Sequence, residues 1–456
     1  MKLNNLHLIE GYGINAIYNS INMDLSIINS STFQCLKDLQ SGLSYNELAI
    51  NKNFSQEQKD NLRSFVDELM QEPSVCEEKS GIKKKNVSRI TLHISNDCNL
   101  RCKYCYAEGG SYKQKRVLMS QQTAHDFVNF CSNNFERIGY VVFFGGEPTL
   151  NIPIMEYICH LFKQKHENKE CAFLPKFGMI TNGTILNEKL VRLIKEYFSF
   201  ITVSIDGLQE ANDVNRIFSS GKGSYEKIHK FIHTIKEETN VRIRYEATYT
   251  QSHIDMNYTR DDIRKDLMNE FNIGGDVVDE LSIQDNKREA YWSNFDYSTW
   301  QRKEILDFPE GFWGVLQAIK QKRTKTMCGI VKETFAISTN GDIYPCHINN
   351  GEKNSFLGNI NGSNIFNESE YKANIPAINL KENDICINCW ARRICGGCAR
   401  MWFYDFNKKK YRATPNKELC IANKKHLEKI LLLIALCRKD SIIWNRLLNK
   451  NNSINQ

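Results

Sequence analysis

The stretch Arg89-Ile-Thr-Leu-His-Ile-Ser95, apolar enough for a buried strand, is followed closely by Cys98-Asn-Leu-Arg-Cys102-Lys-Tyr-Cys105. The three cysteines have the spacing C-x3-C-x2-C, so their thiolates can hold one metal centre. A [4Fe–4S] cluster is normally held by four cysteines, and three would leave one iron with an open position. Catalytic metal sites keep such a position, whereas structural sites are closed. A structural Cys3His zinc site is the alternative, but its nearest histidine, His93, lies in the strand at the wrong spacing.

Strand-like and helix-like segments alternate after this stretch. Buried strands are predicted at 89–95, 140–144, 177–181, 200–205 and 241–249, with helices such as 120–135 and 187–197 between them and a last helix at about 423–448. This alternation predicts an α/β fold with a parallel sheet or an open βα barrel. In such folds the active site lies at the carboxyl ends of the strands.

Short motifs occupy three of these predicted strand ends. Gly145-Gly146-Glu147-Pro148 ends the second strand, Thr181-Asn182-Gly183 the third and Ser204-Ile205-Asp206-Gly207 the fourth, and Arg216 follows. Glycine lets the backbone approach a ligand closely, and a carboxylate can accept from an ammonium group. Each motif alone is a common strand-end turn, but their order behind the cysteines predicts a shared binding edge.

The cysteine triad and these motifs resemble the radical S-adenosylmethionine (SAM) superfamily. The resemblance implies that SAM chelates the open iron through its amino and carboxylate groups. One electron from the cluster then splits SAM to a 5′-deoxyadenosyl radical, which removes a hydrogen atom from a C–H bond. The resemblance also implies the SAM contacts: Gly145, Gly146, Glu147 and Pro148 at the amino group, Asn182 and Ser204 at the ribose and carboxylate, Arg216 at the carboxylate, and Tyr104 near the adenine. For Tyr104, ordinary loop packing is an equal alternative.

A second group of cysteines begins with Cys328, followed by twelve residues, Gly341, four residues and Cys346. Cys386-x2-Cys389-x5-Cys395-x2-Cys398 and Cys420 complete it. A zinc ribbon explains two CxxC pairs but not the other cysteines. The pattern resembles the SPASM extension, which implies two auxiliary [4Fe–4S] clusters. One would be held by Cys386, Cys389, Cys395 and Cys420, and the other by Cys328, Cys346 and Cys398.

This second group departs from the SPASM pattern at two places. The family usually has three residues before the Cys398 position, where this chain has only Gly396 and Gly397, which still allow the loop to turn. Some members have a fourth cysteine six residues after the first, where this chain has Thr334. The cluster of Cys328 is therefore expected to have a vacant iron. In thioether-forming relatives such an iron can bind a substrate cysteine; a water or a nearby side chain is the alternative.

The first 72 residues differ in composition from the rest. Strand-like segments at 7–9, 15–18 and 25–28 precede helices, the clearest of which has a Ser55–Gln58 capping box and ends before Pro73. They predict a winged-helix-like β3α3 module (1–72), followed by a linker (73–87), a partial barrel (88–325) and a cysteine-rich SPASM domain (326–456). The module resembles peptide-recognition elements, which add a leader peptide to the sheet edge as a strand. A cap on the next domain is an equal alternative.

Composition limits the other functional classes. The 456 residues carry a net charge of +7, and the only dense basic runs are 83–85 and 408–410, too short to predict nucleic-acid binding. No signal peptide is visible, and the longest apolar run, 430–437, is shorter than the roughly 20 residues of a membrane span. A cytoplasmic location is expected, where disulfides are rare and cysteines serve metals or catalysis. The remaining cysteines are expected to be buried apolar side chains: Cys35, Cys76, Cys131, Cys159, Cys171 and Cys437.

Two features bear on the reaction within the superfamily. Anaerobic sulfatase maturases usually carry an Asp base after the Cys346 position, where this chain has His347, which can also act as a base. The residues Gly109-Gly-Ser-Tyr112 and Leu118-Met119-Ser120 resemble maturases that form thioethers in cysteine-rich peptides. The resemblance predicts thioether formation on a precursor peptide with a leader, and an external reductant of flavodoxin or ferredoxin type. Formylglycine formation, carbon–carbon crosslinking and epimerisation remain alternatives, as does a non-catalytic zinc-ribbon nucleic-acid binder.

Overall fold

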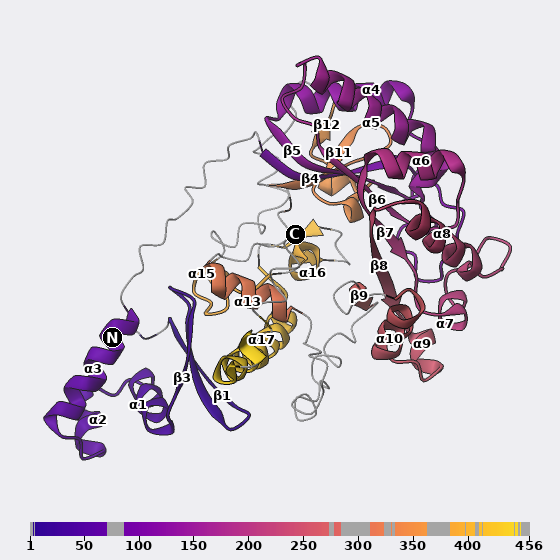
Figure 1. Cartoon of the computed structure of the whole chain (residues 1–456). Helices are drawn as coiled ribbons and strands as arrows, with labels where there is room; N and C mark the ends of the chain where they lie inside the picture. The colour runs from indigo at the N-terminus through magenta and orange to yellow at the C-terminus, as the bar shows by residue number, and fades with distance from the viewer. Residues whose placement is uncertain are drawn as a thin grey trace. The chain divides into compact units, whose positions relative to one another are not determined.

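The structure is a computed structural model in which the chain forms two compact units, each built from several segments (Figure 1). The first unit comprises residues 1–80, 289–328 and 376–456, and the second comprises 81–288 and 329–375. The structure describes residues 3, 5–70, 86–272, 278–283, 311–322, 330, 333–362, 384–396, 398–405, 410–412, 414–441, 443–445 and 447. Pro73, Cys76, Cys328, Gly397 and most of the predicted linker lie outside these residues.

A nine-stranded sheet with the order β12-β11-β10-β4-β5-β6-β7-β8-β9 organises the second unit. The strands from β10 through β4 to β9 pair in parallel, whereas β11 and β12 are antiparallel. Because β12 and β9 are its two ends, the sheet formed by the described strands is open, which confirms the predicted open βα barrel. The strands are β4 (Asn86–Ser95), β5 (Arg137–Gly145), β6 (Lys176–Thr181), β7 (Phe198–Ser204), β8 (Arg242–Tyr249), β9 (Val278–Ile283), β10 (Thr334–Ile337), β11 (Asp342–Tyr344) and β12 (Gly358–Asn359).

Helices connect successive parallel strands, and α4, α5, α6 and α8 lie along the outer side of the sheet (Figure 1). Ser120 and Asn187 cap α4 and α6 by accepting from Thr123 N and Leu190 N, so both helices begin where the sequence predicted. The helices of this unit are α4 (Gln121–Asn134), α5 (Ile152–Glu167), α6 (Glu188–Tyr197), α7 (Gln209–Asp213), α8 (Tyr225–Glu238), α9 (Gln251–Asp255) and α10 (Arg260–Glu270), with short 3-10 turns η1 (Pro148–Asn151), η2 (His347–Asn349) and η3 (Lys353–Ser355).

The N-terminal part of the first unit has the predicted β3α3 order. Its strands β1 (Leu6–Gly11), β2 (Ile14–Asn19) and β3 (Asp24–Ile28) form an antiparallel sheet with β2 in the centre. Its helices are α1 (Ser30–Gln40), α2 (Tyr45–Asn51) and α3 (Gln56–Met70). The capping box before α3 is present: Ser55 N donates to Gln58 Oε1 at 2.9 Å, and Gln58 N donates to Ser55 Oγ at 3.1 Å.

Both faces of this small sheet are covered. On one face, Leu6 and Ile17 form a core with Leu36 of α1 and Val66 of α3. The other face contributes Tyr18 and its neighbours to a core with α13 (Phe312–Gln321) and α17 (Lys417–Lys439). The module thus shares a core with the C-terminal helix. The remaining elements of this unit are α15 (Asp384–Ile387), α16 (Ala399–Phe403), β13 (Tyr404–Asp405) and β14 (Lys410–Tyr411).

Two regions differ from the sequence-based expectation. The C-terminal helix α17 begins at Lys417 rather than near 423, because Asn416 caps it by accepting from Leu419 N, and it ends at Lys439. The strands β10 to β12 were expected in a separate cysteine-rich domain, but β10 joins the barrel sheet beside β4. The predicted domains are continuous stretches of the sequence, whereas each compact unit combines several separate segments.

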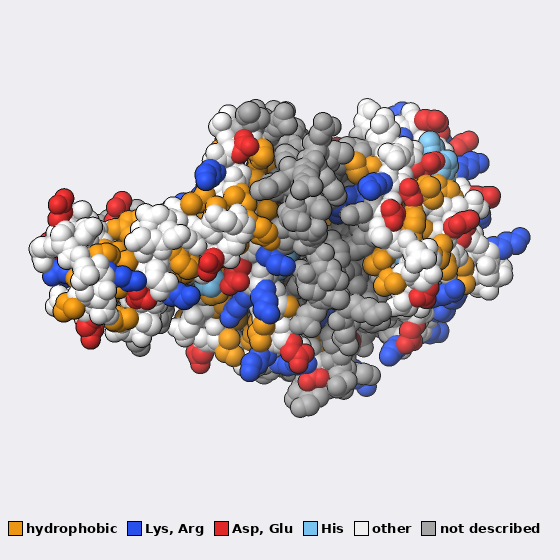
Figure 2. Space-filling view, turned by 90° about the horizontal axis from the view of Figure 1, so that it is seen from below, with side chains coloured by type: hydrophobic (Ala, Val, Ile, Leu, Met, Phe, Trp, Pro, Cys, Tyr) orange, Lys and Arg blue, Asp and Glu red, His pale blue; other side chains and the backbone are white. Residues whose placement is uncertain are grey.

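The described surface shows no sign of a membrane span or a large basic field. No helix among the described residues is long and apolar enough to cross a membrane. On the face seen in Figure 2, Lys and Arg side chains are interspersed with Asp and Glu side chains wherever residues are described. This distribution agrees with the mild net charge.

Candidate functional site

The cysteine triad lies on the loop that follows β4. Cys98, Cys102 and Cys105 are all half-buried. Backbone bonds hold the loop in place, since Arg101 N donates to Ile217 O at 2.7 Å and Lys103 N donates to Asn215 O at 3.1 Å. The triad is therefore tied to the segment that follows β7.

The environment of the triad disfavours free thiolates. Burial raises the pKa of Cys98 to about 12, and the nearby Glu147 adds to this shift. Burial also raises the pKa of Cys102, although the Arg216 guanidinium opposes the change. Because thiolate is the form that binds metals, the positive charge of a metal centre would favour the ionisation of Cys98 and Cys102.

The spacing of the triad is wider than a single zinc ion needs. In a tetrahedral site with Zn–S bonds of about 2.3 Å, the sulfurs lie about 3.8 Å apart. In the described part of the chain, no triad cysteine belongs to a group of three ligand atoms within 4.8 Å of one another. His93, the zinc candidate, is buried, and its Nδ1 lies 3.1 Å from Asn350 Nδ2.

Two glycines bring the end of β5 against the triad loop. Gly146 N donates to Ser95 O at 2.8 Å, and Gly145 adopts a φ of +140°. A Cβ on Gly146 would lie 2.2 Å from Asp97 O, and one on Gly110 would lie 2.4 Å from the Gly146 Cα. Only glycine fits these positions, so Gly145-Gly146 and Gly109-Gly110 serve first to pack two loops together.

Glu147 joins the loops after β5 and β6. Its carboxylate is fully buried and accepts from Thr149 N (3.0 Å), Thr149 Oγ1, Thr181 Oγ1 and Asn182 N (each 2.7 Å). Burial raises the pKa of Glu147, and these hydrogen bonds oppose the rise. The carboxylate therefore positions the strand ends, while contact between the Gly145–Pro148 motif and SAM stays a prediction.

Asn182 reaches the triad from the end of β6. Its Nδ2 lies 3.6 Å from Cys98 Sγ and donates to Asn99 Oδ1 at 2.9 Å. Its Oδ1 accepts from Thr184 N at 3.0 Å and from Thr184 Oγ1 at 2.7 Å. The side chain is thus held beside the first cysteine, although the predicted SAM contact is not itself tested.

Tyr104, Asp206 and Arg216 form a buried polar network. The Tyr104 hydroxyl donates to Asp206 Oδ2 at 2.7 Å and accepts from Arg216 Nη1 at 2.7 Å. Burial raises the pKa of Asp206, while Arg216 opposes the shift. Arg216 is only 6% exposed, and its Nε has no hydrogen-bond partner among the described residues. A buried guanidinium with an unsatisfied donor beside Cys102 is chemically suited to an incoming carboxylate.

The segment after β11 lies on the same side of the barrel. Cys346 Sγ lies 3.6 Å from His347 Nδ1, and the His347 ring lies 4.9 Å from the ring of Phe144 at the end of β5. Tyr106, with 56% of its surface exposed, lies within electrostatic reach of both Cys105 and Cys346. The structure therefore places Cys346 near the triad loop.

The four cysteines predicted for the closed auxiliary cluster all belong to the first unit. Burial raises the pKa of Cys386 to about 11. The nearby Cys420 and Cys389 also raise this pKa, by smaller amounts. Asn423, one turn after Cys420 on α17, donates to Cys395 Sγ at 3.5 Å. In the other predicted set, Cys328 lies outside the described residues, and Cys346 and Cys398 belong to different compact units. Those ligand assignments stay predictions.

Two parts of the sequence match known domain families. Residues 92–263 match the Radical SAM superfamily, and residues 328–390 match the SPASM iron–sulfur cluster-binding domain. The chain carries a radical SAM domain and a SPASM domain. The cofactors of a radical SAM enzyme of this kind are SAM, a [4Fe–4S] cluster and auxiliary iron–sulfur clusters.

Related proteins support this assignment. Over 350 residues, this radical SAM enzyme is 26% identical to the cysteine-type anaerobic sulfatase-maturating enzyme of Clostridium novyi, covering 69% of this chain and 88% of the relative. It is 24% identical over 363 residues to the antilisterial bacteriocin subtilosin biosynthesis protein AlbA of Bacillus subtilis, covering 75% and 73%. The solved structure of native anSMEcpe with bound AdoMet has a TM-score of 0.58 at 21% identity, covering 76% of this chain and 99% of that one, which shows a shared fold.

Some functional groups of this radical SAM enzyme are not visible in its sequence motifs. Asp206 was noted only within its turn, yet its carboxylate anchors Tyr104 and Arg216. Ser204 ends β7 as predicted and pairs there with Glu246 of β8. Pro148 begins η1 directly after Glu147. Five of the spare cysteines are buried as expected: Cys35, Cys131, Cys159, Cys171 and Cys437.

Proposed function

We propose that this enzyme matures a ribosomally made peptide by forming thioether bonds between cysteine sulfurs and carbon atoms. The observation that carries the proposal is Thr334, which stands where some relatives have a fourth ligand for the auxiliary cluster of Cys346. A missing thiolate leaves an iron that a substrate cysteine can ligate. Ligation there keeps the sulfur deprotonated and oriented for bond formation.

The residues around the triad fit SAM and its cluster. Cys98, Cys102 and Cys105 would hold three irons, Gly146 supplies close backbone approach, and the unsatisfied Arg216 Nε would receive the SAM carboxylate. When bound, SAM and its cluster would supply a carbon radical that removes a hydrogen atom from the peptide. The polar network of Tyr104 and Asp206 holds Arg216 in place before SAM binds.

The peptide would lie across Tyr106, between the triad loop and Cys346. Tyr106 exposes a large aromatic surface, and its ring lies 6.0 Å from that of Tyr112. Tyr112 is itself anchored, since its hydroxyl donates to Gly145 O at 3.1 Å. An exposed aromatic on an anchored base is suited to hold an apolar peptide side chain.

A leader peptide would bind at the edge of β3. Because both faces of the small sheet are packed, only its edge strands β1 and β3 can accept a further strand. β3 is the more exposed of the two, with Ser26 exposed and Ile27 at 39% exposure. Strand addition there would have to accommodate Arg438 of α17, whose Nη1 donates to Leu25 O at 2.9 Å.

Co-expression with a short cysteine-rich peptide that carries a leader sequence tests the thioether proposal. Mass spectrometry should show the loss of two hydrogens per crosslink and one thiol per crosslink that no longer reacts with iodoacetamide. The Cys102→Ala enzyme is the matched control and should leave the peptide unchanged. A modified peptide that keeps every thiol alkylatable would contradict thioether formation.

Formylglycine formation is the second candidate, favoured by the similarity to the Clostridium novyi sulfatase-maturating enzyme. In that reaction His347 would stand where those maturases usually have an Asp base. A synthetic sulfatase peptide with a target cysteine separates the two proposals. Conversion of its thiol to an aldehyde would support this candidate, and recovery of the unchanged peptide would exclude that substrate.

A further inference from the structure

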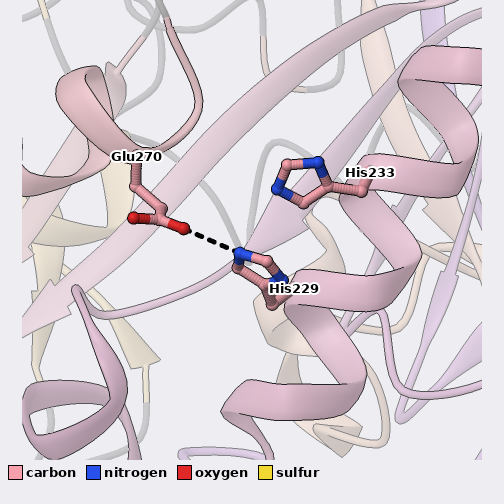
Figure 3. Close-up of side chains that lie close together, drawn as sticks. All are labelled: His229, His233 and Glu270. Carbon is pink, nitrogen blue, oxygen red and sulfur yellow. Dashed lines mark hydrogen bonds and ion pairs between the residues drawn. The ribbon is translucent and has the colours of Figure 1, made fainter.

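Two histidines and a glutamate form a cluster outside the site described above. His229 and His233 are four residues apart on α8 and therefore lie on one face of the helix. Glu270 is the last residue of α10. One ligand atom from each of the three side chains lies within 4.8 Å of the other two. Figure 3 shows the two imidazole rings and the carboxylate gathered around one point.

The contacts within the cluster leave one buried nitrogen, His233 Nε2, without a hydrogen-bond partner among the described residues. His229 Nε2 and Glu270 Oε1 are 2.7 Å apart, while the rings of His229 and His233 lie 4.3 Å apart between centroids. Buried polar atoms normally have a partner. In Figure 3 the His233 ring turns a nitrogen toward the space between Glu270 and His229.

The surroundings favour a cation at this point. Asp266 lies one turn before Glu270 on α10, and both carboxylates act electrostatically on Tyr225, whose ring lies 5.6 Å from that of His229. Lys236, three residues after His233 on α8, donates to the Phe271 carbonyl. Phe271 packs under both imidazoles, at 5.7 and 5.9 Å, and limits their movement.

We propose that His229, His233 and Glu270 bind a divalent transition-metal ion such as Zn²⁺. Two imidazoles and one carboxylate suit zinc and its neighbours rather than Mg²⁺ or Ca²⁺, which prefer oxygen ligands. With bonds of about 2.0–2.1 Å, tetrahedral ligand atoms lie about 3.3 Å apart. Small side-chain rotations therefore close the site, and a water takes the fourth position. The bound ion crosslinks α8 and α10 through these side chains.

Zinc binding to the cluster-loaded, chelator-washed enzyme tests this proposal. One equivalent of Zn²⁺ should give a zinc K-edge absorption spectrum with only nitrogen and oxygen neighbours at about 2.0–2.1 Å, including imidazole. Calorimetric affinity should fall at least about tenfold in His229→Ala and His233→Ala. His160→Ala, at an exposed position on α5, is the matched control and should bind zinc normally.

A sulfur shell at about 2.3 Å would mean that zinc occupies cysteines instead, and would overturn the proposal. Unchanged affinity in His233→Ala would also overturn it. Glu270→Gln guards against loss through misfolding, because Glu270 is exposed and glutamine keeps its size. That variant should keep the wild-type melting temperature without metal and lose the increase that zinc produces in the wild type. An equal zinc-induced increase in Glu270→Gln would count against the site.

Discussion

Gly110 and Gly146 pack backbone to backbone, so closely that a Cβ on Gly110 would lie 2.4 Å from the Gly146 Cα. Gly110 belongs to the loop after the triad, and Gly146 to the end of β5. Their contact means that the two loops needed for the cluster and for SAM cannot be placed independently.

Gly146→Ala should therefore damage the triad site. The new methyl would meet Asp97 O at 2.2 Å and push the loop bearing Cys98 away. We expect loss of about four irons per chain, from one cluster, and loss of 5′-deoxyadenosine production. Gly221→Ala is the control, because nothing lies within 4 Å of its new Cβ, although its φ of +81° disfavours alanine. Equal iron content in both variants would show that the loops tolerate separation.

Arg216→Lys should weaken SAM binding while keeping the buried positive charge. Lysine cannot reproduce both the bond to Tyr104 and the donor that Nε offers. A hydrogen bond to a charged group contributes about 1.5–3 kcal/mol, so the Kd for SAM should rise about 10- to 150-fold. Anaerobic equilibrium binding measures this change. Tyr104→Phe, which keeps the guanidinium, should have a smaller effect; the reverse order would argue against Arg216 as the carboxylate partner.

Deletion of residues 1–72 should destabilise the rest of the chain. The deletion exposes the apolar face of α17, where Leu431 and Ile434 are buried with Tyr18. We expect a lower melting temperature and increased binding of a hydrophobic dye. An independent appended module would instead come away without either effect.

Ile27→Pro offers a cleaner test of leader binding than the deletion. Ile27 is exposed on the edge strand β3, and proline disfavours pairing at a strand edge. The affinity for the precursor peptide should fall, whereas SAM cleavage without peptide should be retained. Ile27→Ala is the control. Ile50→Pro would not serve, because Ile50, although exposed, lies within the helix α2, which proline would disrupt. Unchanged leader affinity in Ile27→Pro would move the binding site away from β3.

Cys386→Ala should remove one auxiliary cluster and spare the first. Cys386 lies near Cys389 and Cys420, in a different compact unit from the triad. Iron should fall by about four per chain, while SAM cleavage should persist. Cys131→Ala, a buried cysteine outside every predicted cluster, should keep full iron. Complete loss of SAM cleavage in Cys386→Ala would show that the clusters do not assemble separately.

The sequence predicted the barrel well because each element carries its own signal. Strand ends such as 181 and 249 and helix caps such as Ser120 are local features, set by apolar runs and by side chains that bond their own backbone. The small N-terminal sheet was predicted for the same reason, but its packing on α17 was not. That contact joins segments about four hundred residues apart, and no local pattern reports it.

The candidate site shows the same division. The spacing of the cysteines predicted metal ligands, whereas the contacts of Asp206 depend on Tyr104 and Arg216 meeting from two other loops. Glu147 was predicted from its sequence motif to contact SAM. In the structure its carboxylate accepts four hydrogen bonds from the protein, which the motif alone did not indicate. His229 and His233 are four residues apart, so the sequence alone places them on one face of a helix. Their partner Glu270 comes from another helix, which no local pattern indicates.

An open iron at the triad can be observed by electron–nuclear double resonance on the reduced enzyme, with SAM labelled by oxygen-17 in its carboxylate. If Cys98, Cys102 and Cys105 leave one iron open to SAM, the spectrum should contain a coupling between the cluster and the labelled oxygen. A cluster signal without that coupling, at saturating SAM, would contradict SAM binding at the triad cluster.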